Sequence, residues 1–126
     1  MREFEGSAMI ATSADRLFNY LADVRHLPDY FPKALSAKTG EGDQLSIVLD
    51  LGGEAVELHA WFRADEARRL LQWGIPDAAY QGWIAITSGP IGCELVVSVQ
   101  KPIDDDTIDA EIRDTILGIR SIMRRS

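Results

Sequence analysis

Six short strand-like stretches between Leu35 and Lys101 constrain the fold of this chain more than any other feature. Five turn signals separate them, at residues 40–43, 52–53, 65–67, 76–77 and 88–92. Apolar and polar residues alternate within these stretches, as expected for a sheet with one buried face. Connections this short favour antiparallel neighbours, because parallel pairing needs a crossover of about a dozen residues or more. The pattern predicts an antiparallel meander whose inner face holds Leu45, Ile47, Leu49, Leu51, Val56, Leu58, Ala60 and Phe62.

Helical periodicity precedes this meander. After a first strand over residues 4–11, Ser13 is placed to cap a helix. The apolar face of that helix is expected to hold Ala14, Leu17, Phe18 and Leu21. A second, very short helical segment is predicted from His26 to Phe31, because the prolines at 28 and 32 leave room for little more than one turn.

The last segment predicts one continuous helix over residues 107–124. Acidic residues cluster at its start and Arg120, Arg124 and Arg125 at its end, which matches the polarity of the helix dipole. A single apolar stripe runs along it through Ile108, Ile112, Ile116, Ile119 and Met123. At 1.5 Å per residue this helix would be about 28 Å long, enough to lie across a small sheet.

The composition indicates one globular domain over residues 1–126. Apolar residues make up 46% and charged residues 26%, close to the averages for globular proteins. The net charge of −7 would repel phosphate backbones, so we expect no nucleic-acid partner. The sequence holds no apolar run of the length that spans a bilayer, and charged residues stand among the first seven positions. We therefore expect a cytosolic protein without membrane insertion, and a homodimer remains open.

Residue types associated with reaction chemistry are sparse. The lone Cys93 is interpreted as a buried structural cysteine. The sequence contains no recognisable nucleophile elbow, phosphate-binding loop or metal-binding motif, so neither a metal nor another cofactor is expected. The weak catalytic candidates are His59, Glu57 and Tyr80. His59 lies near Asp50, Glu54 and Glu57 in the sequence, and imidazole and carboxylate groups can exchange protons.

Aromatic residues carry the ligand-binding prediction. Large amphipathic rings often line ligand cavities, although they fill protein cores equally well. Trp61 shares strand parity with Glu57 and Arg63, which favours an outward direction. The predicted ligand-binding residues are Trp73, Trp83, Tyr80, Phe62, Ile112, Ile116 and Ile119. Gly118 interrupts the last helix, either to leave room for a ligand or to admit a strand.

Two segments carry a resemblance to a known family. The stretch IATSADRLFNYLADVRHLPDYFP, residues 10–32, looks like an opening strand, helix and short second helix, and WFRADEARRLLQW, residues 61–73, is similar to a characteristic strand hairpin. Together with the order of elements, these segments resemble the START and polyketide cyclase/dehydrase superfamily, also called SRPBCC or birch-pollen-allergen-like. The resemblance implies an α+β helix-grip fold, in which about seven antiparallel strands wrap around the long C-terminal helix and two short helices follow the first strand.

The resemblance also implies a cavity between sheet and C-terminal helix. Relatives use it for lipids, polyketides, quinones or hormones, and some for cyclase or dehydratase chemistry. The leading hypothesis is therefore binding or carriage of a small, mostly apolar ligand. The alternatives are a small cyclase or dehydratase that uses the same cavity, and an interaction module that docks through exposed apolar surface around Leu27, Tyr30 and Phe31.

Overall fold

The protein is described by a computed structural model that covers residues 2–31, 34–75, 80–101 and 107–125. The strands in these residues are β1 (Arg2–Ile10), β2 (Ala34–Thr39), β3 (Gln44–Leu51), β4 (Glu54–Asp65), β5 (Leu70–Ile75), β6 (Tyr80–Gly89) and β7 (Gly92–Lys101). The helices are α1 (Ala14–Ala22), the 3-10 turn η1 (Val24–His26), α2 (Leu27–Tyr30) and α3 (Thr107–Arg125). The predicted order of elements is confirmed, and the turn expected at 76–77 lies outside the described residues.

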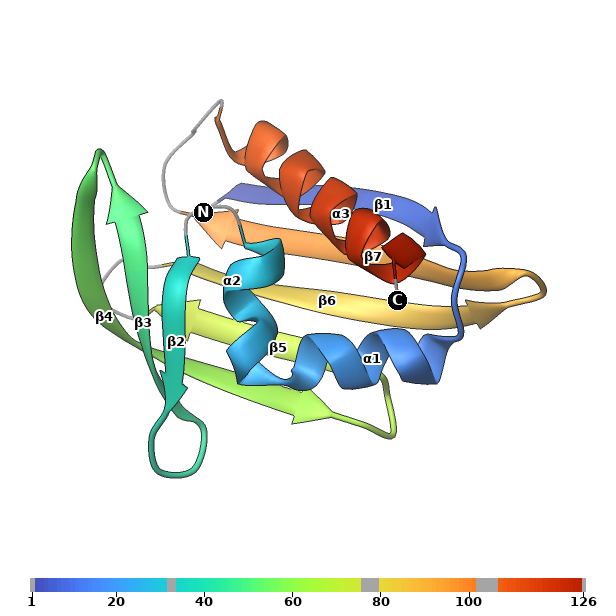
Figure 1. The fold of residues 1–126 in the computed structure, drawn as a ribbon, viewed down its shortest axis with the longest axis horizontal. Helices are drawn as coiled ribbons and strands as arrows, with labels where there is room; N and C mark the ends of the chain where they lie inside the picture. The colour runs from blue at the N-terminus through green and yellow to red at the C-terminus, as the bar shows by residue number, and fades with distance from the viewer. Residues whose placement is uncertain (1, 32–33, 76–79, 102–106, 126) are drawn as a thin grey trace.

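The strands form one antiparallel sheet in the order β1-β7-β6-β5-β4-β3-β2. The meander from β2 to β7 therefore pairs each strand with its neighbour in the chain, and β1 joins at the free edge of β7. Figure 1 shows the sheet curling around the helices, with β2, β3 and β4 turned up at one side. The α+β helix-grip architecture is thus confirmed.

The hairpin between β3 and β4 shows how the local sequence sets the register. Gly52 and Gly53 form its two-residue loop with φ of 66° and 89°, a left-handed conformation that glycine adopts without steric cost. The Asp50 carboxylate accepts a hydrogen bond of 3.0 Å from the Gly53 amide. The resulting register pairs Leu49 with Val56 and Ile47 with Leu58, so the predicted inward residues of both strands share one face.

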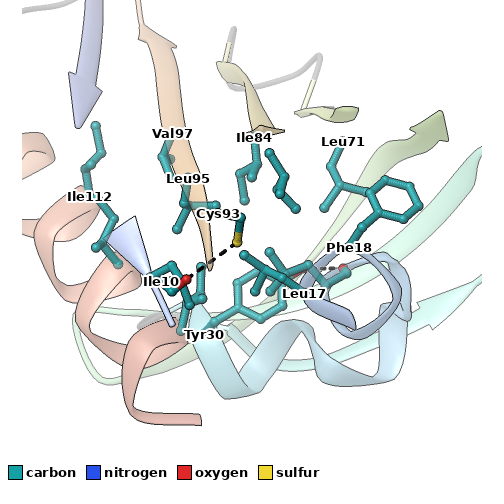
Figure 2. Packing of buried hydrophobic residues seen from close by; sticks show 14 of the residues in the cluster. Ile10, Leu17, Phe18, Tyr30, Leu71, Ile84, Cys93, Leu95, Val97 and Ile112 are labelled. Atoms are coloured by element: carbon teal, nitrogen blue, oxygen red, sulfur yellow. Dashed lines mark hydrogen bonds between the residues drawn. The ribbon is translucent and has the colours of Figure 1, made fainter. Parts of the chain in front are cut away.

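The helices lie on this inner face of the sheet. α3 packs on β1 and β7, α1 on β6 and β7, and α2 against β2 and α3. Ser13 caps α1 by accepting a hydrogen bond from the Arg16 amide, and the predicted apolar face of α1 is buried. Figure 2 shows the side chains of α1 and α2 meeting those of β5, β6 and β7 in the core.

The apolar stripe of α3 is buried where the structure describes it. Ile112, Ile116, Ile119 and Met123 are all at most 8% exposed. The side chains of Leu51 and Ile108, also predicted to face inward, lie outside the described part of the chain. Cys93 is fully buried, burial raises the pKa of its thiol, and its Sγ contacts the Ile10 carbonyl at 3.8 Å, which confirms a structural cysteine (Figure 2).

Among the described helices, none is both long and apolar enough to cross a membrane.

Candidate functional site

The inner face of β4 carries apolar residues that stay partly accessible. Its four inward residues, Val56, Leu58, Ala60 and Phe62, are half-buried. On β3, Leu45 and Ile47 opposite Ala60 and Leu58 are buried, and Leu49 opposite Val56 is half-buried. On β5, the buried Trp73 lies opposite Phe62. In the described residues, α3 packs chiefly on β1, β7 and α2. The row from Val56 to Phe62 is therefore a partly accessible apolar strip, the open strip, whose neighbours Leu45, Ile47 and Trp73 are more deeply buried.

Trp73 borders this strip and is fixed by a glycine. It pairs with Phe62 on β4 and with Gly82 on β6. A Cβ atom at Gly82 would lie only 2.6 Å from Cζ2 of the Trp73 indole, so the ring rests directly on the Gly82 backbone. The Phe31 ring meets the indole edge-on with 5.2 Å between ring centroids. Trp73 is thus held between the sheet and the residue that ends α2.

Tyr80 brings a polar group to the same region. It starts β6 on the inner face, since it shares strand parity with Gly82 and Ile84. Burial raises the pKa of Tyr80 to about 12, and the negative charge of Glu111 on α3 acts in the same direction, while a hydrogen bond from the Trp73 indole opposes them. At neutral pH the Tyr80 phenol is therefore protonated and can donate a hydrogen bond.

Two adjacent stripes of α3 meet different partners. A Cβ atom at Gly6 of β1 would lie 2.7 Å from Ile112 and 3.2 Å from Ile116, so this stripe is pressed against β1. At Gly118 a Cβ atom would lie 3.8 Å from backbone atoms of Asp29 and Tyr30, so Gly118 faces α2. With 3.6 residues per turn, Glu111 and the buried Thr115 fall on the Gly118 stripe. The predicted close approach of a strand to Gly118 is wrong, because the neighbouring element is the helix α2, at ordinary contact distance.

The predicted ligand-binding residues fall into three groups. Phe62 belongs to the open strip, Trp73 lies opposite it on β5, and Tyr80 is on the inner face of β6. Ile112, Ile116 and Ile119 are on the inner side but buried against the fold. The prediction that Trp83 faces the ligand is wrong. Its neighbours in the strand, Gly82 and Ile84, face inward, so the Trp83 side chain lies on the outer face, where it pairs with Gln72 and Ser98.

The acid-base candidates His59 and Glu57 lie outside this region. Both are exposed on β4, on the face opposite to Leu58 and Ala60. Alternation of side chains along a strand therefore directs them away from the inner face, which corrects their assignment to a site shared with Tyr80. Trp61 also faces outward as predicted, with its indole over Gly74 and the Arg63 guanidinium 5.4 Å from its ring.

Other groupings of polar residues give no comparable site. Within the described residues, no three histidine, cysteine or acidic side chains come together as metal ligands would. An open depression of about 470 Å³ lies where the β1–α1 turn meets the β6–β7 hairpin, and there Arg69 and Asp15 form an ion pair with 2.8 Å between Nη2 and Oδ1. No local pattern predicts this pair, since 54 residues separate its members.

The segment around α2 lacks the exposed apolar surface expected of an interaction module. Leu27 and Tyr30 are at most 2% exposed. The Tyr30 hydroxyl donates a hydrogen bond of 2.7 Å to the Leu21 carbonyl. Phe31 is half-buried against Trp73. The exposed apolar surface that the docking hypothesis requires is therefore not present at Leu27, Tyr30 and Phe31.

The sequence does not predict the roles of two residues of the region. Phe31, predicted as part of a docking surface, contacts Trp73 instead. Glu111, one of the acidic residues near the start of the last helix, influences the pKa of Tyr80. A signal for Glu111 exists in the sequence, because Glu111, Thr115 and Gly118 recur at helical spacing beside the apolar stripe.

No protein-family model matches the chain, and no curated protein matches it. Solved structures do match its fold. A START superfamily protein from Mycobacterium smegmatis gives a TM-score of 0.78 at 13% identity, over 98% of this chain and 97% of that protein. Ara h 8.0201 gives 0.75 at 16% identity, over 99% of both chains.

A third solved structure is the di-domain aromatase/cyclase BexL from the BE-7585A biosynthetic pathway. It gives a TM-score of 0.79 at 18% identity, over 96% of this chain and 46% of BexL. The chain thus spans about half the length of that two-domain protein. At identities this low the similarity concerns the fold: the chain has the helix-grip fold of START, or SRPBCC, proteins.

Proposed function

We propose that the protein binds a small, mostly apolar ligand, of the lipid, polyketide or quinone class, between the inner face of the sheet and the helices. The observation that carries the proposal is the half-buried apolar strip of β4, Val56 to Phe62, beside the more deeply buried Leu45 and Ile47 of β3 and Trp73 of β5. Apolar surface on the inner side of a fold is normally covered, and a ligand would cover it here. Trp73 and Tyr80 would border that ligand.

The expected affinity for an unoptimised probe is low. Covering about 200 Å² of apolar ligand surface at roughly 25 cal/mol per Å² contributes about 5 kcal/mol, before the cost of immobilising the ligand. That value corresponds to dissociation constants from hundreds of micromolar upwards. Micromolar binding would therefore require polar contacts in addition to apolar burial.

Tryptophan emission tests the proposal. In the Trp61→Phe/Trp83→Phe variant, Trp73 remains as the sole indole and sits beside the proposed site. Fatty acids, quinones and aromatic polyketide-like compounds should change its emission and raise the melting temperature. The Trp73→Phe variant, with both outer indoles intact, should show no emission response. If no compound class alters emission or melting temperature, ligand binding is the wrong function.

A pair of neighbouring substitutions separates the inner from the outer face. Leu58→Trp adds an indole to the open strip and should weaken binding at least tenfold, because the new ring occupies the ligand's space. His59→Trp adds the same ring on the outer face and should leave binding within twofold. Calorimetry measures both affinities without relying on emission. Equal effects of the two variants would place the ligand elsewhere.

Cyclase or dehydratase chemistry is the second candidate, and the inward position of Tyr80 is the observation that favours it. A buried phenol with a pKa of about 12 can donate a proton or a hydrogen bond to a carbonyl oxygen of a bound substrate. Turnover of a poly-β-keto substrate that falls at least 100-fold in Tyr80→Phe and is unchanged in His59→Ala would establish it. A cytosolic location and a homodimer remain predictions.

A further inference from the structure

The outer face of the sheet carries two neighbouring rows of side chains that lie away from the proposed ligand site. The described helices all lie on the inner face, so the outer face has no covering layer in the part of the chain that the structure describes (Figure 1). The strand register defines both rows, since residues directly opposite each other point to the same face. The first row runs from β4 to β1 through Trp61, Gly74, Gln81, Gln100 and Glu3, and the second through Arg63, Gln72, Trp83, Ser98 and Glu5.

Two half-buried indoles stand at opposite corners of the surface that these rows form on β4, β5 and β6. The Trp61 indole rests on the backbone of Gly74, where an added Cβ atom would lie 2.6 Å from its Cε2 atom. Trp83 lies in the other row and two strands away, so the Cα atoms of the two tryptophans are about 12 Å apart. Gln72 lies between them on β5, directly opposite Trp83. Together with Gln81, these residues form the outer platform.

The polar groups of the outer platform are uncharged amides. The Gln81 amide donates a hydrogen bond to the Gln100 carbonyl oxygen, and the Gln100 amide donates one of 2.9 Å to the Glu3 carboxylate. Because a carboxylate only accepts hydrogen bonds, Glu3 sets the direction of this chain and leaves the Gln81 Oε1 atom as an acceptor at the exposed end. Within the described part of the chain, the Gln72 amide makes no hydrogen bond. It therefore offers both a donor and an acceptor between the two indoles.

The charges in the two rows disfavour an anionic ligand. Each row ends in a glutamate on β1, Glu3 or Glu5. The cation of the second row, Arg63, is already paired with Asp43, with 3.0 Å between Nη2 and Oδ2. A phosphate or carboxylate would therefore meet negative charge and no unpaired cation within these rows. Nucleic acids stack bases on such aromatic rings, but their phosphates require cations that the rows do not supply.

We propose that the outer platform binds a neutral saccharide chain. A pyranose ring has an apolar C–H face that packs on an indole, and its rim carries hydroxyls that both donate and accept hydrogen bonds. These hydroxyls match the free groups of Gln72 and Gln81. A proline-rich peptide also packs on indoles, yet its prolines have no N–H and leave the Gln81 acceptor unmatched. The sheet itself separates this site from the proposed ligand site on the inner face.

Four neutral hexasaccharides test the proposal: cellohexaose, xylohexaose, maltohexaose and N-acetylchitohexaose. Trp73→Phe leaves Trp61 and Trp83 as the only indoles, so its emission reports on the outer face alone. We expect at least one hexasaccharide to change that emission and to bind the wild-type protein in calorimetry. Trp83→Leu should weaken its binding at least tenfold, because the stacking surface is lost. Gln72→Met should weaken it at least threefold, because the amide is lost while the length of the side chain is kept.

Thr87→Ala is the matched control, since Thr87 is exposed on the same face of β6 outside the platform. It should leave the affinity within twofold. Melting temperatures show which variants fold, and if Trp83→Leu does not, Gln72→Met decides alone. Binding of none of the four hexasaccharides overturns the proposal, and so does binding that folded Trp83→Leu and Gln72→Met proteins retain in full. Binding of a poly-L-proline decamer in place of the saccharides would make the platform a peptide surface and overturn it as well.

Discussion

Replacing Gly82 by alanine should disturb the fold and the proposed site together. Gly82 lies on the inner face of β6, and the Trp73 indole rests on its backbone. A Cβ atom there would lie 2.6 Å from both Cζ2 of Trp73 and the Ser98 carbonyl oxygen of β7. Carbon atoms in ordinary contact are about 3.5–4.0 Å apart, so the indole would have to retreat by about 1 Å.

The size of the effect follows from how little the neighbours can yield. The Ser98 carbonyl belongs to a strand that is paired on both sides, with β1 and with β6. The Trp73 ring also contacts Phe31, with 5.2 Å between ring centroids. Overpacking of this kind typically costs 1–3 kcal/mol, partly offset by the lower chain entropy of unfolded alanine. We expect a net loss of about 2 kcal/mol, or about 8 °C in melting temperature for a domain of this size.

Thermal and urea unfolding measure the loss, and near-ultraviolet circular dichroism reports the displaced indole. The matched control is Gly118→Ala, whose Cβ atom would have room at 3.8 Å from α2. That variant should gain up to about 1 kcal/mol from the better helix propensity of alanine. In the Gly82→Ala/Trp73→Leu double variant, part of the cost should disappear because the ring contact is gone. An unchanged melting temperature and spectrum in Gly82→Ala would refute the packing argument.

Three further changes test separate parts of the structure by melting temperature or urea unfolding. Ile112→Asp would bury an unpaired carboxylate against Gly6 and should cost several kcal/mol, so an unaltered midpoint would contradict the burial of this face. Ser98→Ala should stabilise the domain by about 1 kcal/mol, because the buried Ser98 hydroxyl has no hydrogen-bond partner among the described residues; a loss of that size would contradict it. Arg25 lowers the pKa of the Asp23 carboxyl from 3.8 to about 2, so this pair stabilises the folded state above pH 4 and the contribution is lost as the pH falls through 2. Asp23→Asn should therefore flatten the stability profile between those pH values, and identical slopes in both proteins would contradict the assignment.

Much of the sheet could be predicted because its strands alternate clearly. On β4, Val56, Leu58 and Ala60 alternate with Glu57 and His59, so burial of one face determines the direction of all five. His59 and Glu57 were grouped with Tyr80 only by nearness to other acidic residues in the sequence, and the alternation on β4 directs both away from the inner face that carries Tyr80.

The direction of Trp83 could not be predicted in this way. Around it, both faces of β6 carry apolar residues: Trp83 and Ala85 on one side, Ile84 and Ile86 on the other. Hydrophobicity alone does not choose between these two registers. The structure buries both isoleucines and leaves Trp83 half-exposed beside Ser98. The choice depends on pairing with β5 and β7, which is tertiary information.

The open strip on β4 follows from how α3 is anchored. Gly6 lets the Ile112 stripe approach β1, and any side chain at that position would push the helix away from the sheet edge. The adjacent stripe of α3, which holds Gly118, faces α2. The contact at Gly6 and the packing on α2 hold α3 over β1 and β7, on the far side of β5 and β6 from β4. A helix fixed at one side of a curled seven-stranded sheet does not reach its middle strands on the other side, which explains why the inner residues of β4 remain accessible while the strands under α3 are buried. In the proposed binding function, the close approach of α3 to β1 at Gly6, and not the apolar content of the sheet alone, therefore leaves the inner face of β4 accessible to a ligand.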